Sequence, residues 1–456
     1  MKLGVVILAA GKGMRMRSAL PKVLHPLAGR PLIRHVLDAA QALGAARICC
    51  VYGHGGEQVP TAISDADCVW VEQAALLGTG HSVLQALPTL SDMDRVLVLC
   101  GDVPLIEPET LNRLIEDSAH TPLGLLTVRL PDPRGYGRIV RDPAGRVARI
   151  VEHKDASDAE LAIDEVNTGI LVAERAALAA WLAQVDNDNS QGEYYLTDIV
   201  GLAAAAGVEI VTVHPETVEE VAGVNDRLQL ARLERYRQQR LAACLMRTGT
   251  TLLDPARIDI RGSLVCERDV VLDVNLVCEG RVRLGANVRV GPNCVLKDCE
   301  IGPDSEILAY SLIEGARIGA GARIGPFARL RPGADISDRC HIGNFVEVKQ
   351  SRIAEDSKVN HLSYIGDAEI GAQVNVGAGT ITCNYDGANK HRTIIGERAF
   401  IGSNAALVAP VEIGAGATIG AGSVICRTAP AERLTLTRAP QVTVEHWRRP
   451  EKKSAE

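Results

Sequence analysis

The sequence lacks a long apolar run, an extended basic cluster and cysteines in C-x-x-C spacing. No stretch approaches the ~20 uninterrupted apolar residues of a membrane-spanning helix. The formal net charge is −7, and no block of like charge exceeds a few residues before the short basic tail WRRPEKK. Nucleic-acid binders need a clustered basic face for phosphate contacts. We therefore expect small-molecule partners, with no nucleic acid and no membrane.

The twelve cysteines contain no C-x-x-C pair, and most lie among apolar neighbours, as in ICCVYG and VLVLCGD. That spacing favours small buried residues in a reducing compartment over a disulfide framework or a zinc site. The N-terminal apolar run could imitate a signal peptide, but the stretch from Gly11 to Arg17 ends it too early. The expected location is the cytoplasm.

Before about residue 226, apolar runs alternate with helical patterns, which is typical of a parallel sheet with helical crossovers. The expected strands are VVILAA, RICCVYG, DCVWVEQ, RVLVLCGD and GLLTVRL, and the helices include PLIRHVLDAAQALG and ETLNRLIEDSA. Ligands of such sheets bind at the carboxyl ends of the strands. The pattern predicts a Rossmann-like α/β domain with functional loops at LAAGKG and GDVP.

A helical segment, Asp226 to Arg247, separates this half from a repetitive one. Beyond Asp254 an aliphatic residue recurs at every sixth position, commonly followed by glycine, and five-residue steps join the runs. The positions are Leu284, Val290, Leu296, Ile301, Ile307, Ile313, Ile318, Ile324, Leu330, Ile336, Ile342, Val348, Ile353, Val359 and Ile365, then Ile395, Ile401, Leu407, Ile413, Ile419 and Ile425.

A six-residue period of this kind predicts a parallel β-helix, in which three hexapeptides form one triangular coil with the aliphatic side chains inward. A glycine-rich β-sandwich would instead alternate with period two. The hydrophilic stretch TITCNYDGANKHRT, Thr380 to Thr393, breaks the period and is expected to project as a functional loop. The predicted organisation is a first domain over 1–227, a linker helix over 228–248 and the β-helix over 249–456.

The glycine turn after the first strand fits neither G-x-G-x-x-G nor a P-loop, because Lys12 precedes the second glycine and no third glycine follows. Backbone N–H groups of the turn can still approach a nucleotide, and Arg15 and Lys22 supply positive charge for a triphosphate. Asp102, at a strand end, can hold a hard cation such as Mg²⁺. Each observation alone is weak, since a strand-end Asp is often a turn residue. Together they favour nucleotidyl transfer by in-line displacement.

An ordered series of motifs adds a resemblance over essentially the whole chain. The series is LAAGKG, LPKVLH, LGTGH, GDVPL, GYGRI, VEHKDA, VNTGI, QGEYYLTDI and GVNDR, then GPFARLRPGA, GNFVEVK, NVGAGTITCNYDG and WRRP. The chain resembles the bifunctional bacterial enzymes that form UDP-N-acetylglucosamine, a precursor of peptidoglycan and lipopolysaccharide. These enzymes join a glucosamine-1-phosphate N-acetyltransferase to an N-acetylglucosamine-1-phosphate uridyltransferase. The resemblance implies a left-handed β-helix and a homotrimer whose sites lie between neighbouring β-helices.

The resemblance also implies residues for uridylyl transfer. Asp102 and Asn225 would ligate Mg²⁺. Because aromatic residues make up only 3% of the chain, base stacking cannot carry recognition, whereas the amide of Gln73 can pair with the polar edge of uracil. Met14 and Cys100 depart from the family pattern, which usually has Thr and often Tyr there. The implied nucleotide contacts are Leu8, Ala9, Ala10, Gly11, Lys22, Gln73, Gly78 and Thr79, and the implied sugar contacts are Gly137, Glu152 and Asn167.

For acetyl transfer, the resemblance implies His361 as general base, because the attacking amine must be neutral and imidazole titrates near pH 7. Arg331 and Lys349 would hold the sugar phosphate. Tyr364, Asn375, Asn384 and Tyr385 would surround the sugar, and acetyl-CoA would meet Ala378, Ser403, Ala421 and Arg438. Two alternatives are a pyrophosphorylase with a regulatory β-helix and a non-catalytic trimerisation module. His361, Lys349 and the loop favour catalysis, because a scaffold needs none of them.

Overall fold

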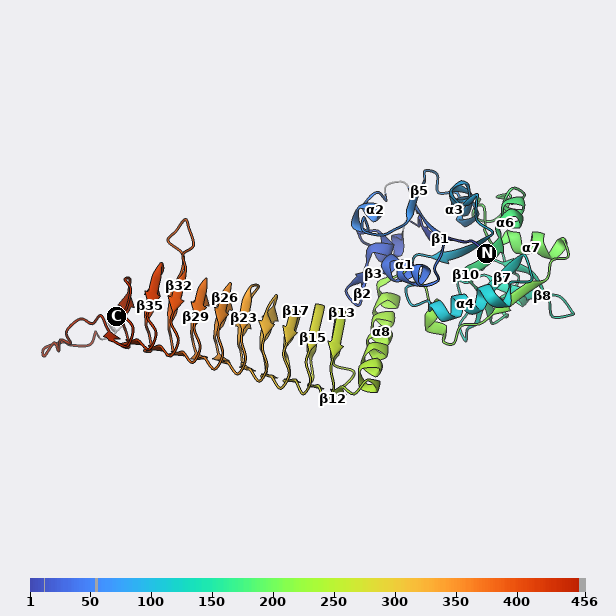
Figure 1. Ribbon diagram of the computed structural model, residues 1–456. Helices are drawn as coiled ribbons and strands as arrows, with labels where there is room; N and C mark the ends of the chain where they lie inside the picture. The colour runs from blue at the N-terminus through green and yellow to red at the C-terminus, as the bar shows by residue number, and fades with distance from the viewer. Residues whose placement is uncertain (12, 54–55, 451–456) are drawn as a thin grey trace, which may run out of the picture. The chain divides into compact units, whose positions relative to one another are not determined.

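The computed structural model describes residues 1–11, 13–53 and 56–450, so Lys12 of the glycine turn lies outside the described residues. Two compact units divide between Arg240 and Leu241. Figure 1 draws the first unit in blue to green and the second in green to red. Among the described residues, no helix combines the length and the apolar character needed to cross a bilayer.

The first unit is built on a mixed sheet of nine strands. All five strands and both helices predicted from the alternating pattern are present. In order across the sheet the main strands are β11 (Ile210–Val213), β7 (Leu123–Arg129), β10 (Glu165–Glu174), β6 (Arg95–Cys100), β1 (Leu3–Ala9), β4 (Arg47–Gly53) and β5 (Val69–Gln73). The hairpin of β8 (Arg138–Arg141) and β9 (Val147–Val151) joins beside β10, and the short pair β2 (Pro26–Leu27) and β3 (Arg30–Pro31) lies apart from this sheet.

The prediction of a parallel sheet is wrong at β10 and at the β8–β9 hairpin beside it. β1 runs parallel to β4 and β6, but β10 runs antiparallel to both β6 and β7. The physical reason is that the β8–β9 hairpin, and not a crossover helix, precedes β10, so the chain returns to the sheet from its opposite end. The register between β10 and β7 shifts between Asn167 and Leu171, as at a β-bulge.

Helices cover both faces of this sheet. On β1, Val5 and Ile7 pack into one core, and Val6 packs into the other, as the two-residue period of a strand requires. The first core is covered by α1 (Leu32–Ala42) and α4 (Pro108–Asp117), and the second by α3 (Thr79–Ala86), α6 (Arg175–Leu182) and α7 (Asp198–Ala205). The shorter helices are α2 (Gln58–Ala62) and α5 (Asp158–Leu161), with 3₁₀ turns η1 (Met14–Met16), η2 (Lys22–Leu24), η3 (Leu87–Leu90) and η4 (Val218–Val221).

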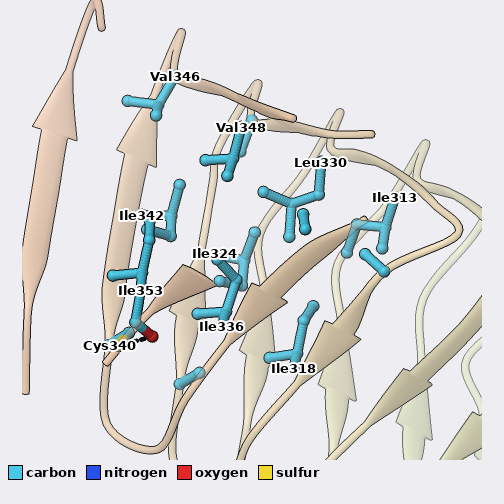
Figure 2. Close-up of a cluster of buried hydrophobic side chains, with 14 of the residues drawn as sticks. Ile313, Ile318, Ile324, Leu330, Ile336, Cys340, Ile342, Val346, Val348 and Ile353 are labelled. Atoms are coloured by element: carbon cyan, nitrogen blue, oxygen red, sulfur yellow. Dashed lines mark hydrogen bonds between the residues drawn. The ribbon is translucent and has the colours of Figure 1, made fainter. Parts of the chain in front are cut away.

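The helix predicted before the repeats is α8 (Arg227–Arg247), whose last turns belong to the second unit, and a left-handed parallel β-helix with three faces follows it. All the aliphatic positions picked out by the six-residue period are buried, at 3% exposure or less. Figure 2 shows part of this stack, from Ile313 to Ile353. The period therefore predicts the core of the β-helix correctly, because the aliphatic residue of each hexapeptide points inward and stacks on its equivalents in the neighbouring coils.

Each face is a ladder of short parallel strands. The first face contains β12 (Thr251–Leu252), β14 (Val271–Leu272), β16 (Arg289–Val290), β18 (Glu306–Ile307), β21 (Arg323–Ile324), β24 (His341–Asn344), β27 (Lys358–His361), β30 (Asn375–Val376), β33 (Phe400–Ile401), β36 (Thr418–Ile419) and β38 (Leu434–Thr435). The second face contains β19 (Leu312–Glu314), β22 (Arg329–Leu330), β25 (Glu347–Lys349), β28 (Tyr364–Gly366), β31 (Ile381–Cys383), β34 (Ala406–Val408) and β37 (Val424–Ile425).

The third face contains β20 (Arg317–Ile318), β23 (Ala334–Ile336), β26 (Ser351–Ile353), β29 (Ala368–Ile370), β32 (Thr393–Ile395) and β35 (Val411–Ile413). Three longer strands, β13 (Ile258–Cys266), β15 (Leu276–Leu284) and β17 (Val295–Ile301), bend from the second face into the third. We call the turn between the first and second faces the first corner. It carries left-handed residues with bulky side chains, namely Tyr310, Phe327, Phe345 and Leu362.

The predicted interruption of the repeat begins too early. β31 continues the second face and pairs with β28 and β34, and Thr382 is fully buried where the period demands an inward side chain. The hydroxyl of Thr382 accepts a hydrogen bond of 2.8 Å from the N–H of Gly366 and donates one of 3.1 Å to its carbonyl. A polar residue can thus occupy the aliphatic site, and the projecting loop is confined to residues 384–392 (Figure 1).

Candidate active sites

The first unit contains a cavity of about 520 Å³ at the carboxyl ends of β1, β5 and β6. This is the edge of the sheet at which parallel strands present ligand-binding loops. The glycine turn, Lys22, the end of β5 and the loop after β6 all contribute to its wall. The predicted residues that line it are Leu8, Ala9, Ala10, Gly11, Lys22, Gln73, Gly78, Thr79 and Asp102.

Two cations and two oxygen donors meet beside this cavity. The ammonium of Lys22 donates a hydrogen bond to the carboxylate of Asp102 and lies 3.4 Å from Oδ1 of Asn225. A guanidinium nitrogen of Arg15 donates to the same Oδ1 at 2.9 Å. Gly13 permits this approach, because it has φ +58° and a Cβ at this position would lie 2.7 Å from Cβ of Lys22. The missing side chain of Gly13 therefore lets the turn pack directly against Lys22.

Asp102 and Asn225 fit a hard divalent cation. Both present side-chain oxygens to one ammonium group, and the N–H of Val224 donates to the carbonyl of Asp102 at 2.9 Å, which ties the two loops together. Mg²⁺ takes oxygen ligands and keeps positions for water and substrate phosphates. Among the described residues, no group of three or more His, Cys, Asp or Glu side chains could hold a metal alone. Such an ion would thus depend on the phosphates of its substrate.

Gln73 is held in one orientation at the end of β5. Its buried amide nitrogen donates to the carbonyl of Gly78 at 3.1 Å and lies 2.9 Å from Nδ1 of His81, and its oxygen accepts a hydrogen bond of 2.6 Å from the hydroxyl of Ser82. The amide hydrogens are thereby used, and the oxygen keeps one lone pair for a ligand. Ser82 lines the same cavity, and the sequence offered no reason to select it.

Gly137, Glu152 and Asn167 form a second group, just before β8, just after β9 and within β10 respectively. The N–H of Asn167 donates to the carbonyl of Gly137 at 2.9 Å, and a Cβ on Gly137 would lie 3.3 Å from Oε1 of Glu152. Burial raises the pKa of Glu152, and a hydrogen bond of 3.1 Å from the Thr197 hydroxyl opposes that rise. The sugar-binding residues expected from the sequence therefore converge.

The segment from Glu193 to Thr197 connects the two groups. The N–H of Leu196 donates to the hydroxyl of Thr79 at 3.1 Å, while Thr197 holds Glu152. The carbonyl of Tyr194 excludes any side chain at Gly78, because a Cβ there would lie 2.7 Å from it at φ +104°. The motif QGEYYLTDI marks this segment, but its position between the two groups appears only in the fold.

The two positions that depart from the family pattern differ in their surroundings. Met14 is 81% exposed on η1 and does not line the cavity. Cys100 does line it, and its thiol lies 3.7 Å from the carbonyl of Gly169. Burial, with a smaller contribution from the Asp102 carboxylate, raises the pKa of Cys100 to about 12. Cys100 is therefore a neutral side chain at physiological pH.

In the second unit, His361 begins a column of residues along the first corner. Lys358, Asn375, Phe400 and Thr418 are register partners in successive coils. The residues three positions after each of them therefore also occupy equivalent places in these coils. Hydrogen bonds of 3.2, 2.7 and 2.8 Å from the next coil to the carbonyls of His361, Ala378 and Ser403 connect the column. We call this set the His361 column; its members are His361, Ala378, Ser403 and Ala421.

The column ends near a cation. A guanidinium nitrogen of Arg438 lies 3.4 Å from the site of a Cβ on Gly420, the residue before Ala421. The acetyl-CoA residues expected from the sequence are therefore arranged in one line, with a titratable side chain at one end and a guanidinium at the other.

Cationic side chains gather where strands β22 and β25 of the second face end. The Arg331 guanidinium donates to Oε1 of Glu347 at 2.9 Å. The ammonium of Lys390 chiefly lowers the pKa of Lys349, with smaller contributions from desolvation and the charge of Arg331, and Asp367 opposes them. Lys390 lies on the projecting loop and was not expected from the sequence. Three like charges this close favour the binding of an anion.

Tyr364 and Asn384 extend this group. The side-chain amide of Asn384 donates to the carboxylate of Asp367 and lies 3.5 Å from the hydroxyl of Tyr364. Two of the predicted sugar contacts lie elsewhere within one chain. Asn375 points outward from the first face, and the hydroxyl of Tyr385 donates to the carbonyl of Gly387 in its own loop at 2.6 Å.

Comparison with protein families agrees with this division. Residues 5–192 match the MobA-like NTP transferase domain, a range that includes every predicted residue of the cavity and of the second group but not Asn225. Residues 315–350 and 392–427 match the bacterial transferase hexapeptide family (six repeats), on the β-helix. The family assignments thus place a nucleotidyltransferase fold before a hexapeptide transferase fold.

Curated relatives match both halves together. The Bifunctional protein GlmU of Azoarcus sp. (strain BH72) is 59% identical over 98% of this chain and 99% of its own length. The proteins of the same name from Aromatoleum aromaticum and Cupriavidus pinatubonensis are 58% and 55% identical, each over 99% of this chain and at least 99% of their own length. At this identity and coverage, the chain belongs to the GlmU family of bifunctional transferases.

Proposed function

We propose that this chain makes UDP-N-acetylglucosamine in two steps, acetylating glucosamine-1-phosphate in the β-helix and then transferring a uridylyl group in the first unit. The observation that carries the proposal is the presence of two separate polar sites, one in each unit. The first unit gathers cations and oxygen donors at the strand ends, and the second presents a base, a line of small residues and an anion site.

For uridylyl transfer, the phosphate oxygen of N-acetylglucosamine-1-phosphate attacks the α-phosphorus of UTP, and pyrophosphate leaves. Lys22 and Arg15 would neutralise the charge of the triphosphate, and the turn of Leu8 to Gly11 would lie against the nucleotide. The free lone pair on the Gln73 oxygen suits the N3–H of uracil. Glu152, Asn167 and Gly137 would hold the sugar.

Asp102 and Asn225 would hold Mg²⁺, whose positive charge would neutralise the charge of the phosphates during displacement. Lys22 would release its contacts to these oxygens and turn toward the phosphates when the ion binds. That exchange would put a divalent cation beside Asp102 in place of a monovalent one, and the added positive charge would offset the charge of the phosphates.

For acetyl transfer, the amine of glucosamine-1-phosphate attacks the acetyl carbonyl, and the thiolate of coenzyme A leaves. His361 would take the proton from the amine. β28 begins three residues after His361 and ends beside Asp367, and three strand residues span roughly 10 Å. A sugar phosphate lying along β28 could thus place its amine near His361 and its phosphate near Lys349, Lys390 and Arg331.

Acetyl-CoA would lie along the His361 column. Ala378, Ser403 and Ala421 have small side chains that leave room for the pantetheine arm, and Arg438 would meet the phosphates beyond them. This direction brings the thioester to His361, where the amine is activated.

The active form would be a homotrimer. Tyr310, Phe327 and Phe345 stack on one another at the first corner with centroids 5.0 and 5.2 Å apart, yet each is about half exposed. All three also hold left-handed backbone conformations that are costly for aromatic residues. An exposed apolar ladder beside the His361 column suits burial against another β-helix. A neighbouring chain could then supply Asn375, which faces away from Tyr364 within one chain.

A product assay tests this function. The purified chain with glucosamine-1-phosphate, acetyl-CoA, UTP and Mg²⁺ should form UDP-N-acetylglucosamine, coenzyme A and pyrophosphate in equal amounts, measured by mass spectrometry. Without acetyl-CoA, N-acetylglucosamine-1-phosphate should restore the nucleotide product. Formation of UDP-N-acetylglucosamine only from the acetylated sugar would mean that the β-helix is not catalytic.

A further inference from the structure

We propose that Asn344 is a positioning residue for acetyl transfer, whose side-chain oxygen holds Nδ1–H of His361 so that Nε2 carries the lone pair offered to the amine. The inference rests on the proposed function, because it concerns the residue that would act as base there. It adds a partner to His361 that the sequence motifs do not identify.

The contact joins two successive coils. Oδ1 of Asn344, at the end of β24, lies 2.8 Å from Nδ1 of His361, at the end of β27. The two residues are register partners in the parallel ladder of the first face. Close approach of the coils fixes this register, because a Cβ on the preceding Gly343 would lie only 1.9 Å from the carbonyl oxygen of Asn360. No side chain fits there, so the glycine brings Asn344 over His361.

The chemistry of the contact sets the tautomer. An amide oxygen only accepts hydrogen bonds, so the imidazole must place its proton on Nδ1. A neutral imidazole with Nδ1–H has its lone pair on Nε2, which is where a general base needs it. The main chain of His361 is held as well, since its carbonyl accepts bonds from the Ser363 hydroxyl at 2.8 Å and from the next coil. His361 is exposed, so Nε2 remains accessible to substrate.

Few other charges act on this imidazole from the packed strands. The titratable or charged side chains on the three strands concerned are His341 on β24 and Lys358 on β27, and β30 contributes only Asn375 and Val376. Both charged groups stay unchanged when residue 344 is replaced. A change in the pH dependence of acetyl transfer can therefore be assigned to residue 344.

Two variants of the full chain test the inference. Asn344→Leu removes the acceptor, and we expect the acetyl-transfer kcat to fall roughly 10- to 100-fold while KM for both substrates changes by less than about twofold, because orientation and not binding is lost. Asn344→Asp keeps the acceptor and adds a negative charge that stabilises the imidazolium. It should retain most of the plateau rate and move the acid limb of the kcat profile up by about one pH unit or more. Uridylyl transfer, assigned to the other unit, should equal that of the parent, and the unchanged KM values report that the β-helix site is folded.

The outcomes separate this inference from the proposed function. If Asn344→Leu keeps the parent kcat, or if Asn344→Asp leaves the acid limb where it is, Asn344 does not position the base and the inference is wrong. A parent chain without acetyl transfer would instead overturn the proposed function itself. A Leu variant with raised KM and unchanged kcat would assign Asn344 to substrate binding and likewise contradict the inference.

Discussion

The ammonium of Lys22 bridges Asp102 and Asn225, donating to the carboxylate of the first and lying 3.4 Å from Oδ1 of the second. One cation therefore holds together two oxygen donors from loops 123 residues apart in sequence. The same two oxygens are those proposed for Mg²⁺. The arrangement predicts that the site loses transfer activity when either the carboxylate or the metal is removed.

Asp102→Ala should lower the rate of uridylyl transfer by about 10²-fold or more, because charge at the α-phosphorus is no longer balanced. Acetyl transfer should keep the parent rate, since the β-helix site lies in the other unit. Pyrophosphate release and coenzyme A release measure the two reactions separately. Chelation of the metal by EDTA should have the same selective effect.

Asp65→Ala is the matched control, because Asp65 is an exposed carboxylate that pairs with Arg34 away from the cavity. It should leave both reactions unchanged. Near-normal pyrophosphate release by Asp102→Ala would contradict the metal assignment.

Ser82→Ala should weaken base recognition. It removes the hydroxyl that donates to the Gln73 oxygen at 2.6 Å, so the amide loses one of the contacts that fix its orientation. We expect kcat/KM for UTP to fall about two- to tenfold, the range of one neutral hydrogen bond, with a smaller loss for CTP. Ser91→Ala, at an exposed serine after η3, is the control. Equal losses for UTP and CTP would show that Ser82 supports folding only.

Lys390→Ala should raise KM for glucosamine-1-phosphate about tenfold without changing kcat, because the phosphate it would bind does not react. Lys390→Arg should restore most of the affinity. The pKa of Lys349 is held down chiefly by Lys390, so it should rise in the alanine variant. Lys297→Ala is the control, since Lys297 lies on a strand of the β-helix, where Glu279 and Glu314 already pair with it. An unchanged KM in Lys390→Ala would remove Lys390 from the phosphate site.

Phe345→Asn should dissociate the trimer. Asparagine tolerates the left-handed backbone at φ +56° better than phenylalanine, so the β-helix should remain folded while its apolar ladder is interrupted. Light scattering should report smaller species, and acetyl transfer should fall with assembly. Ile394→Asn, at an exposed apolar residue on the third face, should leave the assembly intact. A monomeric parent with full acetyl transfer would contradict the trimeric site.

The core of the β-helix follows from sequence because its period is local. Each aliphatic position, such as Ile324 or Ile342, is set by its spacing along one coil, and all are buried as predicted. The inward position of Thr382 was not predicted because Thr382 is polar. Its hydroxyl forms hydrogen bonds with the main chain of Gly366 in the preceding coil, and spacing alone does not reveal these contacts. The antiparallel direction of β10 was not predicted for a similar reason. It depends on the β8–β9 hairpin, which pairs with β10 beside the main order of strands.

Motifs located much of both candidate sites but missed the residues that orient them. Asp102 and Lys22 lie in short motifs near strand ends, where the parallel sheet places ligands. Ser82, Thr197 and Asn344 contact Gln73, Glu152 and His361 only through folding. Asn344 is separated from His361 by 17 residues, the length of one coil. The motif around neither residue indicates that the two side chains are in contact.

The most direct test of two independent active sites uses two variants, each alone and then mixed. With glucosamine-1-phosphate, acetyl-CoA, UTP and Mg²⁺, Asp102→Ala should accumulate N-acetylglucosamine-1-phosphate. His361→Ala should form almost no product from that mixture, with acetyl transfer lowered roughly 10²- to 10⁴-fold, yet convert added N-acetylglucosamine-1-phosphate at the parent rate.

Mixing the two variants should restore UDP-N-acetylglucosamine, because the intermediate formed by one is a substrate of the other. The measurement is the yield of UDP-N-acetylglucosamine from the mixture against that of each variant alone. Recovery of product only in the mixture is the predicted result. Product from Asp102→Ala alone, or from His361→Ala alone at the parent rate, would contradict the assignment of one reaction to each unit.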